Sequence, residues 1–511
     1  MRSPRIAVIG AGVAGLVAAI DLARAGFEVL LFERAATPGG KMRRVCIEGR
    51  CMDAGPTVFT LRRLFDELFD DAGDSFERRV SLTSAHVLAR HAWSSDERLD
   101  LFADIEQSTD AIGDFAGRRE AQGFRRFAAQ ARRIYETLDG PFMRASRPSP
   151  VALMRRVGLA HIGDLLNIQP FVSLWGSLGR YFRDPRLRQL FARYATYCGS
   201  SPFATPATLM LVAHVEQAGV WYVGGGMHEL AVQLAALAAR KGAALRYACE
   251  IARIELRGGR VDAVQTLQGE RIPVDAVICN ADNNALAAGL FGAEIRGGVR
   301  ATPAAARSLS AITWNLLARC EGFELAHHSV FFGGDYRAEF ADIFRRRRSP
   351  AKPTVYICAQ DRDTAAQAAQ SSERLLCLVN APAVGDTHLF DTAEIDACKA
   401  RISETLANCG LRLHPHADGV VTTPTDFNRL FPGTGGALYG PASHGWMASF
   451  KRPGSRSAIP GLYLAGGSSH PGPGVPMAAT SGRLAAACVR TDFASIREFR
   501  PAAMSGGMSM R

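Results

Sequence analysis

The sequence contains no apolar segment long enough to cross a membrane. Its longest strongly apolar run extends only from Ile6 to Ile20 and includes three glycines, whereas a spanning helix needs about 20 apolar residues. No small-residue cleavage site follows this run before Asp21, so we expect neither a signal peptide nor a transmembrane helix. The sequence predicts a protein on the cytoplasmic side that can attach to a membrane surface without crossing it.

Lysine is scarce. Only five of the 60 basic residues are lysine, the others are arginine, and the formal net charge is +11. This bias is more typical of GC-rich coding than of a nucleic-acid site, and we interpret the single run of four basic residues, Arg345 to Arg348, as a solvated loop. We expect no nucleic-acid partner, although a basic protein does suit an anionic membrane surface.

Paired cysteine motifs are absent as well. The chain has 11 cysteines, an odd number, and no CxxC pair, so the sequence predicts neither a disulfide framework nor a metal site. In its other properties the composition is ordinary: 511 residues, 47% hydrophobic and 21% charged. These values exclude a disordered or fibrous chain and allow two to four globular domains.

The N-terminal residues have the pattern of a βαβ unit that binds a dinucleotide. A β-branched run, Arg5–Ile9, is followed by a GxGxxG motif, a helical pattern that ends at Arg24, and a second apolar strand, Phe27–Glu33. In such a motif the first glycine makes the turn, the second lets the backbone approach a pyrophosphate, and the third lets helix and strand pack closely. An acid at the end of the second strand, where we expect it to be exposed at the surface, can bind a ribose hydroxyl. The predicted contacts are Gly10, Gly12, Gly15 and Glu33.

The residues after Glu33 favour FAD over a nicotinamide cofactor. The glycine pair Gly39 and Gly40, with Lys41, would bring backbone and a cation to the pyrophosphate, and Asp53–Thr57 gives another close backbone approach. The sequence has no second GxGxxG motif and hence no separate NAD(P)H domain. A dinucleotide that stays bound and is recycled in place is typical of FAD.

Two more ordered blocks follow later in the chain. Between Trp221 and Asn280, three glycines precede a helical pattern and then short strands, which we predict at residues 245–247, 251–256, 261–267 and 272–279. The last block begins with a strand at Leu462–Ala465, which we expect inside the sheet, and continues through a glycine- and proline-rich turn into a helix over Val475–Val489. The inserts between the blocks are predicted to be mostly helical (105–210) and mixed (300–455).

These three blocks carry the motifs of one enzyme family. The first has GxGxxG, the ribose acid and the double glycine; the second, Gly219–Met227, has a glycine, an aromatic residue and paired glycines; the third, Leu462–Pro476 with Ser481-Gly482-Arg483, has the most specific pattern. Together they resemble the bacterial-type phytoene desaturase family of carotenoid flavoenzymes along nearly the whole chain. The family usually has threonine where this chain has Ser469, which is a mild departure.

Four shorter strings are similar to one branch of that family, the hydroxyneurosporene (methoxyneurosporene) desaturases of purple bacteria. They are Gly39–Arg43, Asp53–Thr60, Ala89–Trp93 and Leu99–Asp104. Enzymes of this branch introduce the C-3,4 double bond into 1-hydroxy or 1-methoxy acyclic carotenoids on the way to spheroidene or spirilloxanthin. The resemblance implies an FAD-dependent oxidoreductase acting on CH–CH bonds, with hydroxyneurosporene, methoxyneurosporene or hydroxylycopene as substrate and oxygen or a quinone as electron acceptor.

The resemblance also implies a fold. We expect an α/β protein with a Rossmann-like FAD-binding domain of the glutathione-reductase or amine-oxidase type, made of residues 1–85, 215–300 and 455–495. A substrate domain, residues 86–214 and 301–454, would be interleaved with it. Its stretch 115–205 would be mostly helical and membrane-facing, and residues 496–511 would form a disordered tail.

Carried over residue by residue, the resemblance implies contacts along the whole cofactor. The GxGxxG glycines and Glu33 would hold the ADP half, and the backbone of Ile251 would contact adenine. The remaining residues would contact the other parts of FAD: the pyrophosphate (Gly40, Lys41), the flavin ring (Gly55, Pro56, Thr57), and the ribityl chain and isoalloxazine (Gly466, Val475, Pro476, Met477).

The expected reaction needs little acid–base chemistry from the protein. Removing two vicinal hydrogens beside a polyene needs a hydride acceptor, which FAD supplies, and a weak base, because the polyene delocalises the cation. The protein then mainly holds an apolar chain in register and excludes water. No catalytic residue can be named. His444 and His470 are interpreted as structural hydrogen-bonding groups, and the other residues considered stand out no better: the pair His327 and His328, which we take as a loop pair, Asp139 and Glu136.

The segment Val151–Phe182 alternates apolar clusters with basic residues, which is typical of an interfacial helical region. Because carotenoids reside in the bilayer, we expect peripheral attachment to membrane lipid through this segment. The same pattern also fits the helical core of the substrate domain, and that alternative stays open.

Three other functions remain possible. The first is a sibling activity: a phytoene-, neurosporene- or lycopene-type desaturase or a carotenoid isomerase. The second is a non-catalytic lipid-binding relative, similar to the prenyl-binding GDP-dissociation inhibitors, without flavin. The third is an amine oxidase, which shares the FAD fold but would need an aromatic cage around the amine.

Overall fold

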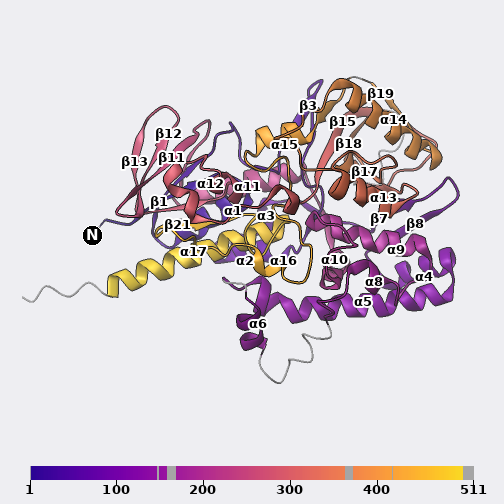
Figure 1. Ribbon diagram of the computed structural model, residues 1–511, viewed down its shortest axis with the longest axis horizontal. Helices are drawn as coiled ribbons and strands as arrows, with labels where there is room; N and C mark the ends of the chain where they lie inside the picture. The colour runs from indigo at the N-terminus through magenta and orange to yellow at the C-terminus, as the bar shows by residue number, and fades with distance from the viewer. Residues whose placement is uncertain (1, 147–148, 158–167, 363–371, 417, 499–511) are drawn as a thin grey trace, which may run out of the picture.

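A five-stranded parallel sheet holds the first, middle and last blocks of the chain together. The computed structural model describes residues 2–146, 149–157, 168–362, 372–416 and 418–498 (Figure 1). The sheet has the order β10–β2–β1–β14–β21, and every neighbouring pair is parallel. Its strands are β1 (Arg5–Ile9), β2 (Glu28–Phe32), β10 (Ala244–Arg246), β14 (Ala276–Cys279) and β21 (Leu462–Leu464).

Three helices cover one face of this sheet. They are α1 (Val13–Arg24), α11 (Met227–Arg240) and α17 (Val475–Glu498), and α1 contacts both of the others. Their apolar faces form one core with the sheet, as the helical pattern of the sequence requires. Helix α17 is longer than predicted and includes the first three residues of the expected tail; residues 499–511 lie outside the described residues.

The other face carries a three-stranded antiparallel sheet, β11 (Ile251–Arg257), β12 (Arg260–Thr266) and β13 (Arg271–Pro273). The strand predicted at 272–279 is wrong, because two strands in different sheets occupy it. The chain crosses between the sheets at Val274, whose N–H donates to Asp262, and Asp275, whose N–H donates to Arg5. The expected interior position of the last strand is also wrong: β21 is the last strand of the sheet, and on its other side it bonds, among the described residues, only to the segment 455–457.

An eight-stranded mixed sheet forms the second half of the molecule, on the right in Figure 1. Helix α14 (Thr392–Asn408) and the short helices α13 (Tyr336–Ala341) and α15 (Pro424–Leu430) accompany it, and its core is separate from that of the parallel sheet. Its strands come from both inserts: β7 (Val87–Ala92), β8 (Arg98–Phe102), β15 (Ser310–Glu321), β16 (His328–Phe331), β17 (Val355–Ala359), β18 (Glu373–Ala381), β19 (Arg412–Pro415) and β20 (Val420–Thr422).

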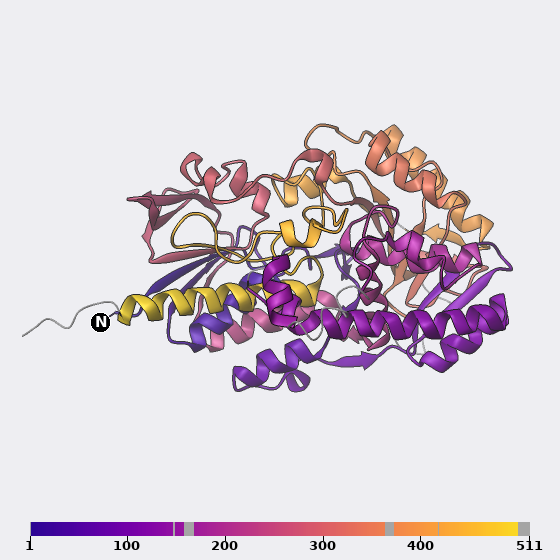
Figure 2. The ribbon, with the colours of Figure 1, turned by 60° about the horizontal axis from the view of Figure 1, so that its bottom comes forward.

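The insert after β8 is mostly helical, as predicted. The long helix α5 runs across the lower side of the molecule (Figure 2) and packs against α4 and α10. No helix among the described residues is long and apolar enough to span a membrane. The helices are α4 (Ile105–Ala116), α5 (Arg118–Leu138), α6 (Pro150–Val157), α8 (Leu174–Leu178), α9 (Pro185–Ala192) and α10 (Leu211–Gln217).

Short elements join the two halves. The strands β5 (Phe59–Thr60), β9 (Val220–Val223) and β6 (Leu82–Ser84) form one small sheet, and β3 (Arg44–Ile47) and β4 (Arg50–Asp53) form a hairpin. The remaining α-helices are α2 (Arg63–Asp71), α3 (Phe76–Arg79), α12 (Asn283–Ala287) and α16 (Ala448–Lys451).

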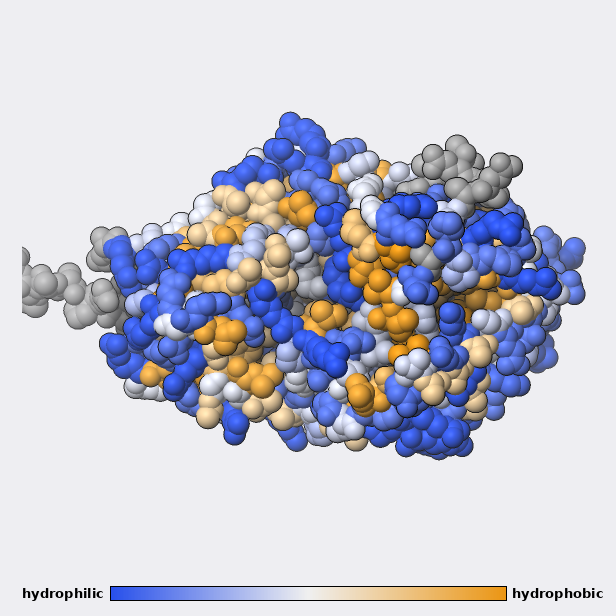
Figure 3. Space-filling model, turned by 90° about the horizontal axis from the view of Figure 1, so that it is seen from above, coloured by the Kyte–Doolittle hydropathy of each residue, from blue (hydrophilic) through white to orange (hydrophobic). Residues whose placement is uncertain are grey.

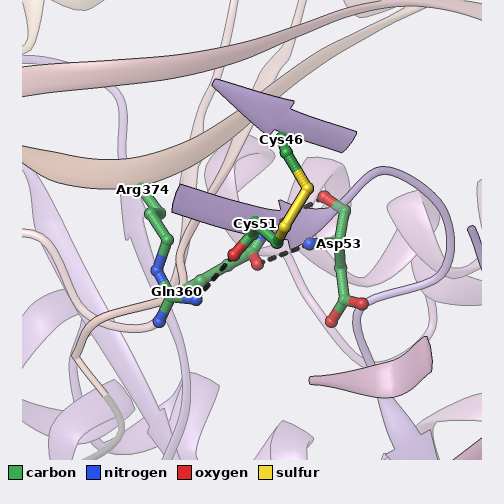
Figure 4. The surroundings of a disulfide bond; sticks show 5 residues. All are labelled: Cys46, Cys51, Asp53, Gln360 and Arg374. Atoms are coloured by element: carbon green, nitrogen blue, oxygen red, sulfur yellow. Dashed lines mark hydrogen bonds between the residues drawn. A yellow bond between two sulfur atoms is a disulfide. The ribbon is translucent and has the colours of Figure 1, made fainter. Parts of the chain in front are cut away.

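The hairpin β3–β4 contains a disulfide that the sequence analysis did not anticipate. Cys46 and Cys51 are cross-strand partners and are bonded to each other (Figure 4). The turn between them, Glu48 and Gly49, has positive φ at both residues, which is the turn that brings two antiparallel strands into direct register. The odd number of cysteines therefore did not exclude one disulfide within a single hairpin.

Candidate functional site

A cavity of about 900 Å³ is lined by residues from all three sequence blocks and from both inserts. Gly15 is the one predicted cofactor residue that does not line it. A Cβ on Gly15 would lie 2.0 Å from the carbonyl oxygen of Gly10, so this glycine allows α1 to pack against the turn. The predicted residues in the cavity wall are Gly10, Gly12, Glu33, Gly40, Lys41, Gly55, Pro56, Thr57, Ile251, Gly466, Val475, Pro476 and Met477.

The N-terminus of α1 opens into the cavity. Gly12 caps this helix without a side-chain hydrogen bond, and the next two residues, Val13 and Ala14, line the wall. Unpaired N–H groups and the helix dipole at such an end favour an anion. Asn280, at the end of β14, was missed by the sequence analysis; its Nδ2 donates to the carbonyl of Gly10 at 3.3 Å and lines the same wall.

Glu33 is buried, which differs from the exposed strand end that we expected. One carboxylate oxygen accepts a hydrogen bond from the Ala11 N–H at 2.7 Å, and the other accepts from the Ala35 N–H at 2.8 Å. A carboxylate has about four acceptor positions, so each oxygen still has room for a ribose hydroxyl. The side chain therefore fits the role predicted for it and also holds the glycine turn in place.

Glu33→Gln should weaken retention of the dinucleotide. The neutral glutamine weakens the hydrogen bonds to the ribose, which contribute about 1.5–3 kcal/mol each when the acceptor is charged. The affinity for FAD should therefore fall about tenfold or more. Flavin absorbance per polypeptide after dialysis measures the effect, with Glu28→Gln on the same strand as control. Full flavin occupancy in the Glu33 variant would show that this acid does not bind the ribose.

Lys41 does not stand exposed to solvent. Its Nζ donates to the Leu438 carbonyl at 2.6 Å and lies 5.3 Å from the ring centre of Phe431. Burial lowers the pKa of Lys41, and the nearby Asp282 opposes this shift. The ammonium group is thus held in the wall of the cavity beside the glycine-rich segments.

The last block forms another part of the wall through a glycine- and proline-rich turn. Gly466 and Gly474 have φ of 116° and 112°, which glycine adopts without strain, and the turn leads into the start of α17. Arg452, which the sequence analysis missed, is buried beneath this turn and donates to three backbone carbonyls, those of Tyr439, Pro441 and Gly467.

Part of the cavity lining is apolar and aromatic, and we call this part the apolar lobe. Thr57 of the predicted flavin segment is linked to it, and we call this link the junction: its hydroxyl is 2.6 Å from the hydroxyl of Tyr356, which in turn is 2.7 Å from Nδ1 of His328. An apolar lobe of this kind suits a hydrocarbon ligand. Its wall includes Leu209, Leu211, Val212, Val215, Tyr336, Tyr356, Leu376 and Leu378.

None of the four histidines considered from the sequence lines the cavity. His444 accepts from the Ser201 N–H at 3.0 Å, and His470 Nε2 is 2.9 Å from the Phe142 carbonyl. Burial lowers the pKa of both to about 4. These two are structural, as predicted.

The pair His327 and His328 is not a loop pair. His328 begins β16 and is buried, and His327 stacks on Tyr222 with 4.1 Å between ring centres. Their nitrogens and the sulfur of Cys358 lie within 4.8 Å of one another. Asp139 and Glu136 pair with arginines Arg63 and Arg132.

Asp53 ties the disulfide hairpin to both halves of the molecule (Figure 4). Its carboxylate accepts from the N–H groups of Met227 and His228 at the start of α11, and its backbone bonds to the side chain of Gln360. Arg374 donates to the Cys51 carbonyl at 2.8 Å. The hairpin thereby fixes the start of the segment Gly55–Thr57 that lines the cavity.

The segment 151–182 is partly core and partly exposed. Leu153, Leu174 and Phe182 are buried, whereas Val151 is 65% and Phe171 69% exposed. Residues 158–167, and with them part of the predicted segment, lie outside the described residues. The alternative of a helical core is therefore right for some of these side chains and wrong for others.

The chain matches the family model "Flavin containing amine oxidoreductase" over residues 13–490. It is 53% identical to a hydroxyneurosporene desaturase of Rubrivivax gelatinosus, covering 100% of this chain and 98% of the relative. A hydroxyneurosporene desaturase of Cereibacter sphaeroides is 43% identical, covering 96% and 98%. A crystal structure of an oxidoreductase from Methanosarcina mazei shares the fold, with a TM-score of 0.57 at 15% identity over 94% of this chain and 99% of that one.

Proposed function

The chain belongs to the flavin containing amine oxidoreductase family, and we propose that it is an FAD-dependent desaturase that introduces the C-3,4 double bond into 1-hydroxy or 1-methoxy acyclic carotenoids. One observation carries the proposal: a single cavity joins a wall built from the dinucleotide motifs to an apolar lobe, and Thr57 lies at the junction. The high identity to two hydroxyneurosporene desaturases supports the choice of substrate.

FAD is the cofactor, and the residues present fit it. The free N–H groups at the start of α1 suit its pyrophosphate, the remaining acceptor positions of Glu33 suit a ribose, and the start of α17 lines the same cavity for the flavin. When bound, FAD supplies the hydride acceptor for the reaction. We assign the contacts predicted from the sequence, from Gly10 to Met477, on this basis.

The chain's own residues orient the substrate and exclude water. The apolar lobe removes a hydrocarbon chain from solvent at about 25 cal/mol per Å² of apolar surface, and its aromatic side chains restrict how the chain lies. Holding one CH–CH bond near the junction at Thr57 is a positioning effect, which lowers the barrier without acid–base chemistry. The proton that leaves the substrate needs only a weak acceptor, and oxygen or a quinone would take the electrons at the end.

The test is conversion of a defined substrate. The purified protein should be yellow, and with 1-hydroxyneurosporene or 1-hydroxylycopene it should yield a product with one more conjugated double bond at C-3,4. An unchanged chromophore with altered geometry would indicate an isomerase, and desaturation at other positions would indicate a sibling desaturase. A colourless protein that binds carotenoid would indicate a lipid-binding relative instead.

We also propose that the protein attaches to a membrane next to the cavity. Helix α6, on the lower side in Figure 1, exposes Val151 and Met154 beside Arg155 and Arg156, and it contacts the π-helix Asp139–Met143. This π-helix contributes two cavity residues. A route from the bilayer into the apolar lobe is therefore short at this place.

A second exposed pair lies near the same π-helix. Phe171 and Trp446 are in contact, with 5.3 Å between ring centres, and Phe450, soon after Trp446, packs against Phe142 of the π-helix. On the opposite, upper face, hydrophobic residues also gather in a band right of the centre (Figure 3). Exposed hydrophobic residues occur on both faces, so we assign the membrane-binding surface to the lower face because it is near the cavity.

Val151→Asp combined with Phe171→Asp should reduce binding to anionic vesicles about 100-fold or more, because burying each of the two side chains contributes about 1.5 kcal/mol or more. The matched control is Leu267→Asp with Leu389→Asp, since these leucines are 64% and 67% exposed elsewhere. Vesicle flotation at low and high salt measures the effect. Equal binding of both double variants would refute this docking surface.

A further inference from the structure

Arg193 places a cation in the apolar lobe. It begins the 3₁₀ helix Arg193–Cys198 and lines the cavity. Its guanidinium lies over two tyrosine rings, 5.2 Å from the ring centre of Tyr197 and 5.5 Å from that of Tyr356. Tyr356 is the residue that bonds Thr57 at the junction. Tyr356 thus lies between the guanidinium and Thr57, near which the proposed mechanism holds the reacting bond.

The guanidinium is held from behind by a buried acid. Arg193 Nη1 donates to the Tyr197 hydroxyl at 3.2 Å, and that hydroxyl donates to Glu216 at 3.0 Å. Tyr194 donates to the other oxygen of the same carboxylate. Burial raises the pKa of Glu216, while burial of Arg193 is outweighed by Tyr197 and Glu216, so that the pKa of Arg193 is raised as well. Each oxygen of the carboxylate therefore accepts one hydrogen bond from a tyrosine.

Most hydrogen-bonding capacity of Arg193 remains unused. A guanidinium has five N–H donors, yet within the described residues its Nε and Nη2 donate to no acceptor. Among the other cavity-lining cations, Arg34, Lys41 and Arg452 donate to backbone carbonyls, whereas Arg43, like Arg193, donates to a single hydroxyl. Arg193 is half-buried and lines the cavity, and its free donors are not among the fully buried ones, so they can reach a ligand that brings an oxygen into the cavity.

We propose that Arg193 forms a subsite for the oxygen at C-1 of the substrate, with Tyr197 and Glu216 as positioning residues. This inference rests on the proposed function and adds how the end group is recognised. A guanidinium has only hydrogen-bond donors, so it can bind the oxygen of a hydroxyl group and that of a methoxyl group equally. A carboxylate has only acceptors, so it could not form a hydrogen bond with the ether oxygen of a methoxyl group. The C-1 oxygen is a few bonds from C-3 and C-4, which matches the short path from Arg193 through Tyr356 to Thr57. A hydrocarbon end group would offer no acceptor to the donors of Arg193 that Tyr197 does not use.

The experiment compares two substrates of the same chain length, 1-hydroxyneurosporene and neurosporene, with the flavin-loaded enzyme. We expect Arg193→Met to lower the ratio of kcat/KM for the hydroxylated over the hydrocarbon substrate roughly 10- to 100-fold, through loss on the hydroxylated substrate alone. Arg193→Lys should recover part of the ratio. Arg188→Met is the matched control, since Arg188 stacks on Trp175 outside the cavity, and it should leave the ratio unchanged.

Several outcomes would overturn the subsite. They are equal loss on both substrates, an unchanged ratio, reduced flavin content in Arg193→Met, or a wild-type enzyme that does not distinguish the two substrates. Should Arg193→Met fail to fold, Tyr197→Phe keeps the ring and removes only the link to Glu216; it should lower the same ratio by a smaller factor, and an unchanged ratio would again refute the subsite. Failure of the wild type to desaturate either carotenoid would instead refute the proposed function.

Discussion

Replacing Gly482 with valine should leave almost no flavin-containing enzyme. A Cβ at this position would lie 2.3 Å from the carbonyl oxygen of Ala14 and 3.0 Å from its carbonyl carbon. Both clashing groups are backbone in helices, so α17 must move away from α1, and overpacking of a core costs about 1–3 kcal/mol or more. Because the starts of α1 and α17 both line the cavity, the same movement disturbs its wall at two places.

Flavin absorbance per polypeptide should fall about tenfold or more, with a lower melting temperature by circular dichroism. Gly297→Val is the control, because a Cβ on Gly297 meets no atom within 4 Å and its φ is ordinary. A Gly482→Val enzyme with normal flavin content would mean that the two helices do not pack as closely as described.

Arg452→Met should destabilise the protein by about 3–5 kcal/mol and release the flavin. Arg452 is 4% exposed and donates four hydrogen bonds of 2.7–3.2 Å to the carbonyls of Tyr439, Pro441 and Gly467. Burial lowers its pKa to about 10, so it is still charged at neutral pH. Methionine fills the space but leaves buried carbonyls unpaired, each at about 1–3 kcal/mol.

Arg456→Met is the matched control for this effect. Arg456 is half exposed and pairs with Asp492 at 2.7 Å, and such surface pairs contribute about 0–1 kcal/mol. Denaturant unfolding and flavin retention should therefore separate the two variants. If both lose the same stability, Arg452 does not hold the C-terminal turn in the way its contacts indicate.

The parts of the fold that sequence reasoning predicted are those with local causes. The β1–α1–β2 unit follows from one hydrophobic pattern and its glycines, and β1 has the predicted bounds. The boundary between β13 and β14 was missed because the apolar pattern continues through Val274 while the backbone partner changes from Asp262 to Arg5. The edge position of β21 was missed for a similar reason, since nothing in a strand's own residues tells how many neighbours it has.

The residues of the site also divide into those that could be predicted from local sequence and those that could not. Glycine motifs can be recognised in a sequence because close backbone approach excludes a Cβ, and the predicted glycines other than Gly15 do line the cavity. Asn280, Arg452 and Arg193 were missed, since a lone polar residue among apolar ones becomes informative only when its surroundings are known. Glu33 was found with the right neighbours in sequence but the wrong exposure, because the glycine turn that covers it folds back through Ala11.

The order of the segments in the parallel sheet has a consequence for synthesis in the cell. Strand β21 and helix α17 are made long after α1, yet α17 packs on α1. Pairings between such distant segments form slowly. The nascent chain therefore cannot close its cofactor cavity until α17 has been made, and the apolar surface of α1 must stay shielded from other chains throughout that interval. Refolding yield should accordingly depend on protein concentration and on chaperones more than on the stability of the finished enzyme.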